Sequence, residues 1–143
     1  MNPHKLADTG IEEIDREHRE LLRLIQVVRG AAQMGNAAGS QREVVRTALS
    51  RVLAFSRHHF AEEEQLMHKI DFPDFLAHKK EHQTFIDRIL SLQREKFAPS
   101  SDSLSALENW LLYHVEGSDS RIVSRLLELD LPAGDISVAD LFK

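Results

Sequence analysis

Four stretches of the chain place apolar residues three and four positions apart, which is the spacing of one face of an α-helix. The stretches cover residues about 11–34, 41–69, 73–96 and 103–129. Strand patterns are almost absent, and short runs rich in small residues or proline, which interrupt helices, separate the stretches. Four helices of this length with short connections predict an all-α fold, an up-down-up-down antiparallel four-helix bundle.

Length and composition limit the class of protein further. At 143 residues we expect one domain, with the bundle at about 11–130 between a short N-terminal arm and a tail at 131–143. A net charge of −5 without a basic cluster argues against nucleic acid as a partner. No cysteine is present, so any metal must be held by nitrogen and oxygen. No apolar run has the length of a signal peptide or membrane span, so we expect a cytoplasmic protein without a membrane partner.

Polar residues interrupt the apolar faces of all four predicted helices. They are His18, His59, Glu63, His78, His82, His114 and Asp119. Imidazole and carboxylate together are ligands of borderline divalent metals such as iron, manganese or zinc. Seven such groups are more than one tetrahedral ion can use, so the pattern predicts two metals bridged by carboxylates.

The chain offers its own comparison in the second helix. His58 and Glu62 also stand four residues apart, but their face of the helix is largely polar, whereas that of His59 and Glu63 is apolar. Burial of an unpaired carboxylate is costly, so the apolar face marks His59 and Glu63 as the pair with a partner. His4, in the terminal arm, and His68, on a polar face, are expected to have no role.

Depth along the bundle gives an independent argument. At about 1.5 Å per residue, all seven groups lie roughly 8 to 23 Å from the helix ends that share one pole of such a bundle. Asp119 fits this layer less well, because five residues from His114 is roughly 140° around an α-helix. The two side chains either flank a dinuclear site or lie where Gly117 permits a local distortion of the helix.

Several strings resemble hemerythrin, specifically the bacterial hemerythrins of this length: IDREHREL, HHFAEEEQLM, FLAHKKEHQTF and NWLLYHVEGSD. The resemblance covers about residues 10–120. It implies two iron ions (Fe2+/Fe3+), one held by three histidines and one by two, bridged by two carboxylates and an oxo or hydroxo group. The implied ligands of the first iron are His78, His82 and His114, and those of the second are His18 and His59. The implied bridging carboxylates are Glu63 and Asp119. It also implies reversible binding of dioxygen at an open position of the two-histidine iron, as in oxygen carriage, storage or delivery, and not an enzyme.

The resemblance extends to neighbours of the ligands. It implies an oxygen pocket lined by Phe60, Trp110, Leu111 and Val115, although ordinary core residues fit these positions equally well. Glu17 matches an acidic residue that hydrogen-bonds a ligand histidine in some members; a solvated carboxylate at a helix start is the alternative. The chain departs from the family pattern in lacking an N-terminal tryptophan and in having Ile122 in place of an aromatic residue. Both departures concern how tightly the pocket is sealed.

Other functions are weaker interpretations of the same residues. A ferritin-type di-iron oxidase or peroxidase would use Glu-x-x-His motifs, and a zinc hydrolase a motif such as His-Glu-x-x-His; the chain has neither. An oxygen or redox sensor acting on a signalling partner would use the same site as a carrier, and the tail LPAGDISVADLFK fits a packed terminus or a linker equally well. Dioxygen is the partner expected, and no protein partner is indicated.

Overall fold

The computed structural model describes residues 6–34, 40–95 and 98–129, and every regular element within these ranges is a helix. The elements are α1 (Glu12–Ala32), α2 (Gln41–Lys69), α3 (Phe75–Arg94), α4 (Ser101–Tyr113), the π-helical turn η2 (His114–Asp119) and α5 (Ser120–Glu128). The all-α prediction is thus confirmed for the described residues. The predicted tail, residues 131–143, and His4 in the arm lie outside them.

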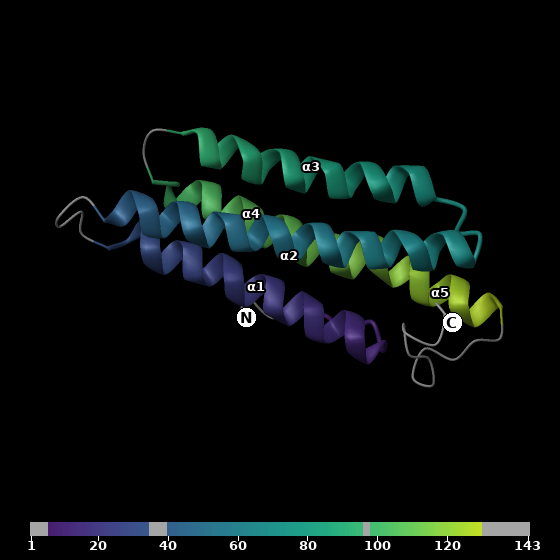
Figure 1. Cartoon of the computed structure of the whole chain (residues 1–143). Coiled ribbons are helices and arrows are strands. Elements are labelled where there is room, and N and C mark those ends of the chain that lie inside the picture. The colour runs from purple at the N-terminus through teal and green to yellow at the C-terminus, as the bar shows by residue number, and fades with distance from the viewer. Residues whose placement is uncertain (1–5, 35–39, 96–97, 130–143) are drawn as a thin grey trace.

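The helices lie side by side along one direction (Figure 1). The starts of α1 and α3 gather with the ends of α2 and α5 at one end of the molecule, and α4, η2 and α5 form one continuous rod (Figure 1). The backbones of α1 and α2, of α2 and α3, and of α1 and α4 approach closely, whereas α3 and α4 face each other at a greater separation. The seam between α3 and α4 is therefore the most loosely closed side of the described bundle.

The start of α1 has no side-chain cap: the residue at the cap position is Ile11. Instead, the Asp15 carboxylate reaches back and accepts hydrogen bonds from Thr9 N and Oγ1, both at 2.7 Å, and from Gly10 N at 3.1 Å. Gly10 has a φ of 94°, a conformation that glycine adopts without steric cost. A carboxylate in the first turn therefore fixes the chain that precedes the helix.

Two other helix starts shift by two residues. α3 begins at Phe75, because Pro73 belongs to the turn that leaves α2. α4 begins at Ser101, earlier than predicted, because the Ser100 side chain accepts a hydrogen bond from Ser103 N at 3.1 Å and caps the helix.

Two apolar clusters form the core, and a polar layer lies between them. In α1, Ile14 belongs to the smaller cluster and Leu21 to the larger one, with His18 between. The rod formed by α4, η2 and α5 repeats this order, with Leu111 in the larger cluster and Ile122 in the smaller. Because buried polar groups are costly without partners, the layer must satisfy its own charges and hydrogen bonds.

Candidate metal centre

The structure brings the seven candidate ligands together in one cluster, with no residue more than 5% exposed. α1, α2, α3 and η2 all contribute. The ligand atoms form two overlapping groups, and within each group they lie within 4.8 Å of one another. The groups are Glu63, His78, His82, His114 and Asp119, here called the three-histidine group, and His18, His59, Glu63 and Asp119, the two-histidine group. Both carboxylates belong to both groups.

The five-residue interval between His114 and Asp119 coincides with the π-turn η2. Hydrogen bonds in a π-helix join residues five apart, so residues at this interval lie on nearly the same face. Asp119 Oδ1 is 3.1 Å from His114 Nε2, and both residues are buried. Of the two alternatives open to the sequence, the structure has the local distortion.

Glu63 divides its two oxygens between the groups. Oε2 lies 2.6 Å from His59 Nε2 and 3.2 Å from His18 Nε2. Oε1 lies 2.9 Å from His82 Nε2 and 3.3 Å from His78 Nε2. One carboxylate thus faces the two-histidine group with one oxygen and the three-histidine group with the other.

Asp119 repeats this division. Its Oδ2 is 3.0 Å from His18 Nε2, whereas Oδ1 is 2.9 Å from His78 Nε2 and 3.1 Å from His114 Nε2. Two carboxylates with this arrangement have the geometry that bridging ligands of a pair of cations require.

Several of these close approaches are not hydrogen bonds. His59 Nε2 and both oxygens of Asp119 have no hydrogen-bond partner within the described ranges, despite their neighbours at 2.6 to 3.1 Å. His82 Nε2 and His114 Nε2 face each other at 3.1 Å. Buried polar atoms are normally satisfied by hydrogen bonds. Lone pairs that converge on common points instead are suited to coordinate cations, so the donor set fits metal ions.

The charges of the cluster depend on proton occupancy. Burial raises the pKa of Glu63, but the positive charge of His59 and the other histidines around it hold this pKa well below its usual value. Burial lowers the pKa of His59, yet Glu63 and Glu17 raise it to about 10. For His78, Asp119 and Glu63 likewise outweigh burial and raise the pKa to about 9. Protonated imidazoles therefore balance the carboxylates in the protein without metal, and a cation that binds must displace these protons.

Three of the five histidines donate their outer Nδ1–H to a carboxylate. The pairs are His59 with Glu17 at 2.7 Å, His82 with Glu64 at 2.9 Å, and His114 with Glu81 at 3.0 Å. Such a bond fixes the tautomer that turns Nε2 toward the cluster, and it increases the basicity of the ring. The outer nitrogen of His18 is buried without a hydrogen-bond partner in the described part of the chain.

Sequence reasoning singled out Glu17 but missed Glu64 and Glu81. All three carboxylates adjoin a candidate ligand in the sequence, yet each binds a histidine of the next helix along the chain. Adjacency to a ligand was the available signal. It could not identify the partner, because the partner depends on how the helices are rotated against each other.

The four candidate pocket residues lie close to the cluster. The Phe60 ring stacks on His82, with centroids 4.0 Å apart and planes at 6°. The Trp110 ring stacks on His114, with centroids 4.5 Å apart and planes at 12°. Leu111 and Val115 are 1% exposed and belong to the larger apolar cluster. Both aromatic rings thus stack on the three-histidine group, and Phe60 also contacts the His59 ring of the two-histidine group, with centroids 5.8 Å apart. The resemblance implies a pocket at the two-histidine iron.

His58 does not join the cluster. Its side chain is 65% exposed, and its Nε2 lies 2.9 Å from Glu62 Oε1 on the outer face of α2. His68 is also exposed. The structure thus buries His59 and leaves its neighbour in solvent.

Comparison with known proteins gives consistent matches. Residues 9–126 match the model of the hemerythrin HHE cation binding domain. A bacteriohemerythrin of Stenotrophomonas maltophilia is 32% identical over 113 residues, which cover 77% of this chain and 71% of the relative. A hemerythrin-like protein of Naegleria gruberi is 30% identical (78% and 82% covered), and a myohemerythrin of Theromyzon tessulatum is 24% identical (80% and 84% covered). No solved structure matches the chain.

A helical protein with a buried cluster of histidines and carboxylates belongs to the class of cation-binding helical domains. The match over residues 9–126 shows the family: the chain belongs to the hemerythrin family. Among the described residues, no helix combines the length and apolarity that crossing a membrane requires.

Proposed function

We propose that this chain is a single domain, an up-down-up-down bundle, that binds dioxygen reversibly at a non-heme di-iron site for its carriage, storage or delivery. The observation that carries the proposal is the division of oxygens in Glu63 and Asp119, each with one oxygen toward each histidine group. A bridged pair of ferrous ions supplies two electrons to dioxygen and recovers them when dioxygen leaves. The bacteriohemerythrin and myohemerythrin relatives support this function.

In this proposal the two groups hold unequal metals. The three-histidine group offers five ligand residues and the two-histidine group four, so a metal held by the two-histidine group would have one protein ligand fewer. In this proposal an oxo or hydroxo group would bridge the metals, and dioxygen would bind on the side of the two-histidine group. The site is proposed to bind oxygen without turning over a substrate, because its ligand set is rich in histidine, with five imidazoles to two carboxylates.

The residues around the cluster would exclude water. Leu111 and Val115 are almost fully buried, and Phe60 covers His82 with its ring. The carboxylates of Glu17, Glu64 and Glu81 would hold the ligand histidines in orientation from outside. Reversible binding of dioxygen depends on a site without water, because water that reaches the site promotes oxidation of the ferrous irons to the ferric state.

The alternatives stay less favoured. The sensor interpretation depended on the tail, which lies outside the described residues. An oxidase or peroxidase is disfavoured by the excess of histidine over carboxylate, and a cytoplasmic location remains a prediction.

An absorption spectrum of the reduced protein before and after exposure to air tests the proposal. We expect two irons per chain by metal analysis and a visible charge-transfer band that disappears when oxygen is removed. A colourless, zinc-loaded protein, or a band that never reverses, would overturn it.

A further inference from the structure

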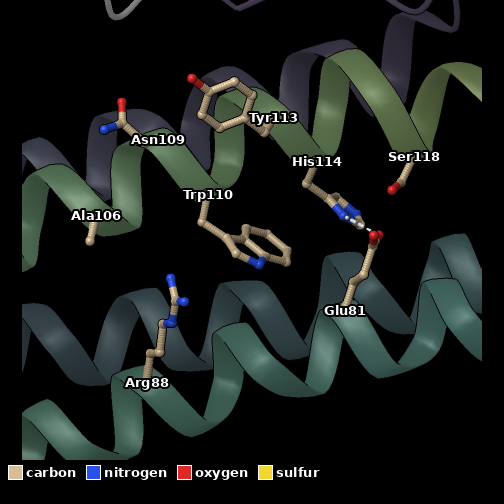
Figure 2. A pocket seen from close by; sticks show the side chains of 8 residues that line it. All are labelled: Glu81, Arg88, Ala106, Asn109, Trp110, Tyr113, His114 and Ser118. Atoms are coloured by element: carbon tan, nitrogen blue, oxygen red, sulfur yellow. Dashed lines mark hydrogen bonds and ion pairs between the residues drawn. The ribbon is translucent and has the colours of Figure 1, made fainter.

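Each carboxylate that holds an outer histidine nitrogen also lines a hollow on the surface. Glu17 lines one beside Phe55, Glu64 lines a second beside Phe60, and Glu81 lines a third of about 390 Å3. The third, here called the Glu81 hollow, lies between α3 and α4 (Figure 2). Its lining residues are Glu81, Arg88, Ala106, Asn109, Trp110, Tyr113, His114 and Ser118.

The Glu81 hollow continues along the loosely closed seam. A second hollow of about 390 Å3 shares Arg88 and Ala106 with it and extends between α3 and α4 toward Ser91 and Ser103. Volumes of this size are those of pockets for small organic ligands. The two hollows together form a groove long enough for a ring system with a side chain.

Two polar groups of the Glu81 hollow act only as hydrogen-bond donors, the Arg88 guanidinium and the Trp110 indole N–H. Arg88 reaches in from α3 (Figure 2), and its guanidinium has no hydrogen bond or ion pair with any residue of the described ranges. The Trp110 indole N–H comes from α4 and points toward α3, whereas the Tyr113 side chain is 75% exposed and its hydroxyl points away from α3 (Figure 2). The Glu81 carboxylate already accepts a hydrogen bond from His114. This chemistry suits an anion with several oxygen acceptors.

Trp110 distinguishes this hollow from the other two. It lines the hollow and also stacks on His114, one of the candidate ligands (Figure 2). Phe60, in the Glu64 hollow, is itself buried, and Phe55, in the Glu17 hollow, has no ring contact with a candidate ligand among the described residues. Phe60 and Trp110 both line a hollow of the described structure and stack on a candidate ligand, but only Trp110 of these two is partly exposed.

We propose that the Glu81 hollow binds a planar aromatic anion of the flavin mononucleotide class and that Trp110 carries electrons from it to His114 and the metals. The phosphate pairs with Arg88, and the flavin ring contacts the indole. A reduced flavin anion gives up two electrons and one proton to become oxidised flavin; each of two ferric ions gains one electron, and the proton passes to solvent at the open side of the hollow. The binding step is independent of the proposed function, whereas the electron-transfer step rests on its di-iron site.

Binding is tested with oxidised flavin mononucleotide on zinc-loaded protein, by calorimetry and by quenching of flavin fluorescence. We expect saturable binding that Arg88→Gln weakens about tenfold. Arg94→Gln removes the same charge from the same helix, outside the hollow, and should leave binding unchanged. Riboflavin, which lacks the phosphate, should bind more weakly and be insensitive to Arg88→Gln. Absence of saturable binding, or equal losses in both arginine variants, overturns the proposal.

Electron transfer is tested by anaerobic stopped-flow reduction of the diferric protein with reduced flavin mononucleotide. The rate should saturate at the concentrations at which the flavin binds. Trp110→Leu should slow the saturated rate about tenfold and Trp110→Phe by less, each relative to the rate at which dithionite, which needs no hollow, reduces the same variant. Thermal melts of both variants check the fold. An unchanged saturated rate in folded Trp110→Leu protein overturns the role of Trp110.

The two proposals fail separately. A protein whose zinc form does not bind flavin but whose ferrous form binds oxygen reversibly would contradict only the Glu81 hollow. A protein that accepts electrons from flavin but shows no reversible oxygen band would contradict only the oxygen-binding proposal.

Discussion

At the level of single residues, His58 and His59 show how far one position on a helix changes the environment of a side chain. His59 is 1% exposed and faces Glu63, whereas His58 faces solvent and pairs with Glu62. Because each helical residue turns by about 100°, adjacent residues cannot share a face. A histidine side chain is therefore not a candidate metal ligand by residue type alone; it must also lie on the buried face of its helix.

Replacement of the two neighbours separates these roles. We expect His59→Ala to lose at least one of two metals per chain, because the two-histidine group retains a single imidazole. His58→Ala removes the same ring from the surface and should keep both metals and the absorption spectrum. Metal analysis of the purified variants provides the measurement. Equal losses from both variants would contradict the assignment of this helix face.

Leu111 tests whether the site is built to exclude water. Leu111→Ala leaves every candidate ligand in place but opens a cavity in the larger apolar cluster, at a stability cost of about 2 to 5 kcal/mol. If water then reaches the metals, we expect the oxygen-induced band to decay about ten times faster, equivalent to about 1.4 kcal/mol of barrier.

Leu107→Ala is the matched control, since Leu107 is equally buried in the same cluster but lies two turns from His114. It should cost comparable stability without the faster decay, measured by stopped-flow spectroscopy. The same decay rate in Leu111→Ala protein and wild type, at full iron occupancy, would remove Leu111 from the pocket.

At the level of elements, the π-turn η2 decides whether Asp119 reaches the cluster. Its widened turn allows residues five apart to act together, which a regular α-helix would prevent. The carboxylates outside the cluster connect further elements, since Glu17 of α1, Glu64 of α2 and Glu81 of α3 each bind a histidine of the next helix. Four helices are thus joined pairwise at the depth of the cluster.

The π-turn does not require the glycine at its centre. Gly117 does not have a positive φ, and a Cβ added there meets no atom within 4 Å. We expect Gly117→Ala to keep both metals and to raise stability by about 0.5 to 1 kcal/mol through lower entropy of the unfolded chain. Gly30→Ala in α1, where a Cβ also has open space, provides the reference value. Denaturant unfolding measures both, and loss of metal from Gly117→Ala alone would show that the distortion needs glycine.

At the level of the whole molecule, a charged layer interrupts the apolar core. Without metal, protons on histidines balance the layer, and the raised pKa values of His59 (about 10) and His78 (about 9) mean that these protons stabilise the fold. A raised pKa gives a contribution that is complete below the usual value of 6.5 and is lost as pH rises through 9 to 10.

We therefore expect the urea midpoint of the metal-free protein to fall between about pH 6.5 and pH 10. With metal bound, the histidines are deprotonated ligands, so this fall should be much smaller. Unfolding curves of both forms across this range provide the comparison. Parallel pH profiles would mean that cluster protons do not contribute to stability.

Much of this molecule was determined by the sequence because helical periodicity is local. The spacing of apolar residues predicted the helices with ends shifted by one or two residues, and polar residues on the apolar faces identified the seven that the structure brings together. The tertiary structure decided the remainder. The carboxylate partners Glu64 and Glu81 depend on which helix faces which and at what rotation. So does the approach of Asp119, at the end of the π-turn, to His18 and His78 of other helices. The two carboxylate–histidine pairs join residues 18 and 33 positions apart, and no pattern within one helix encodes them.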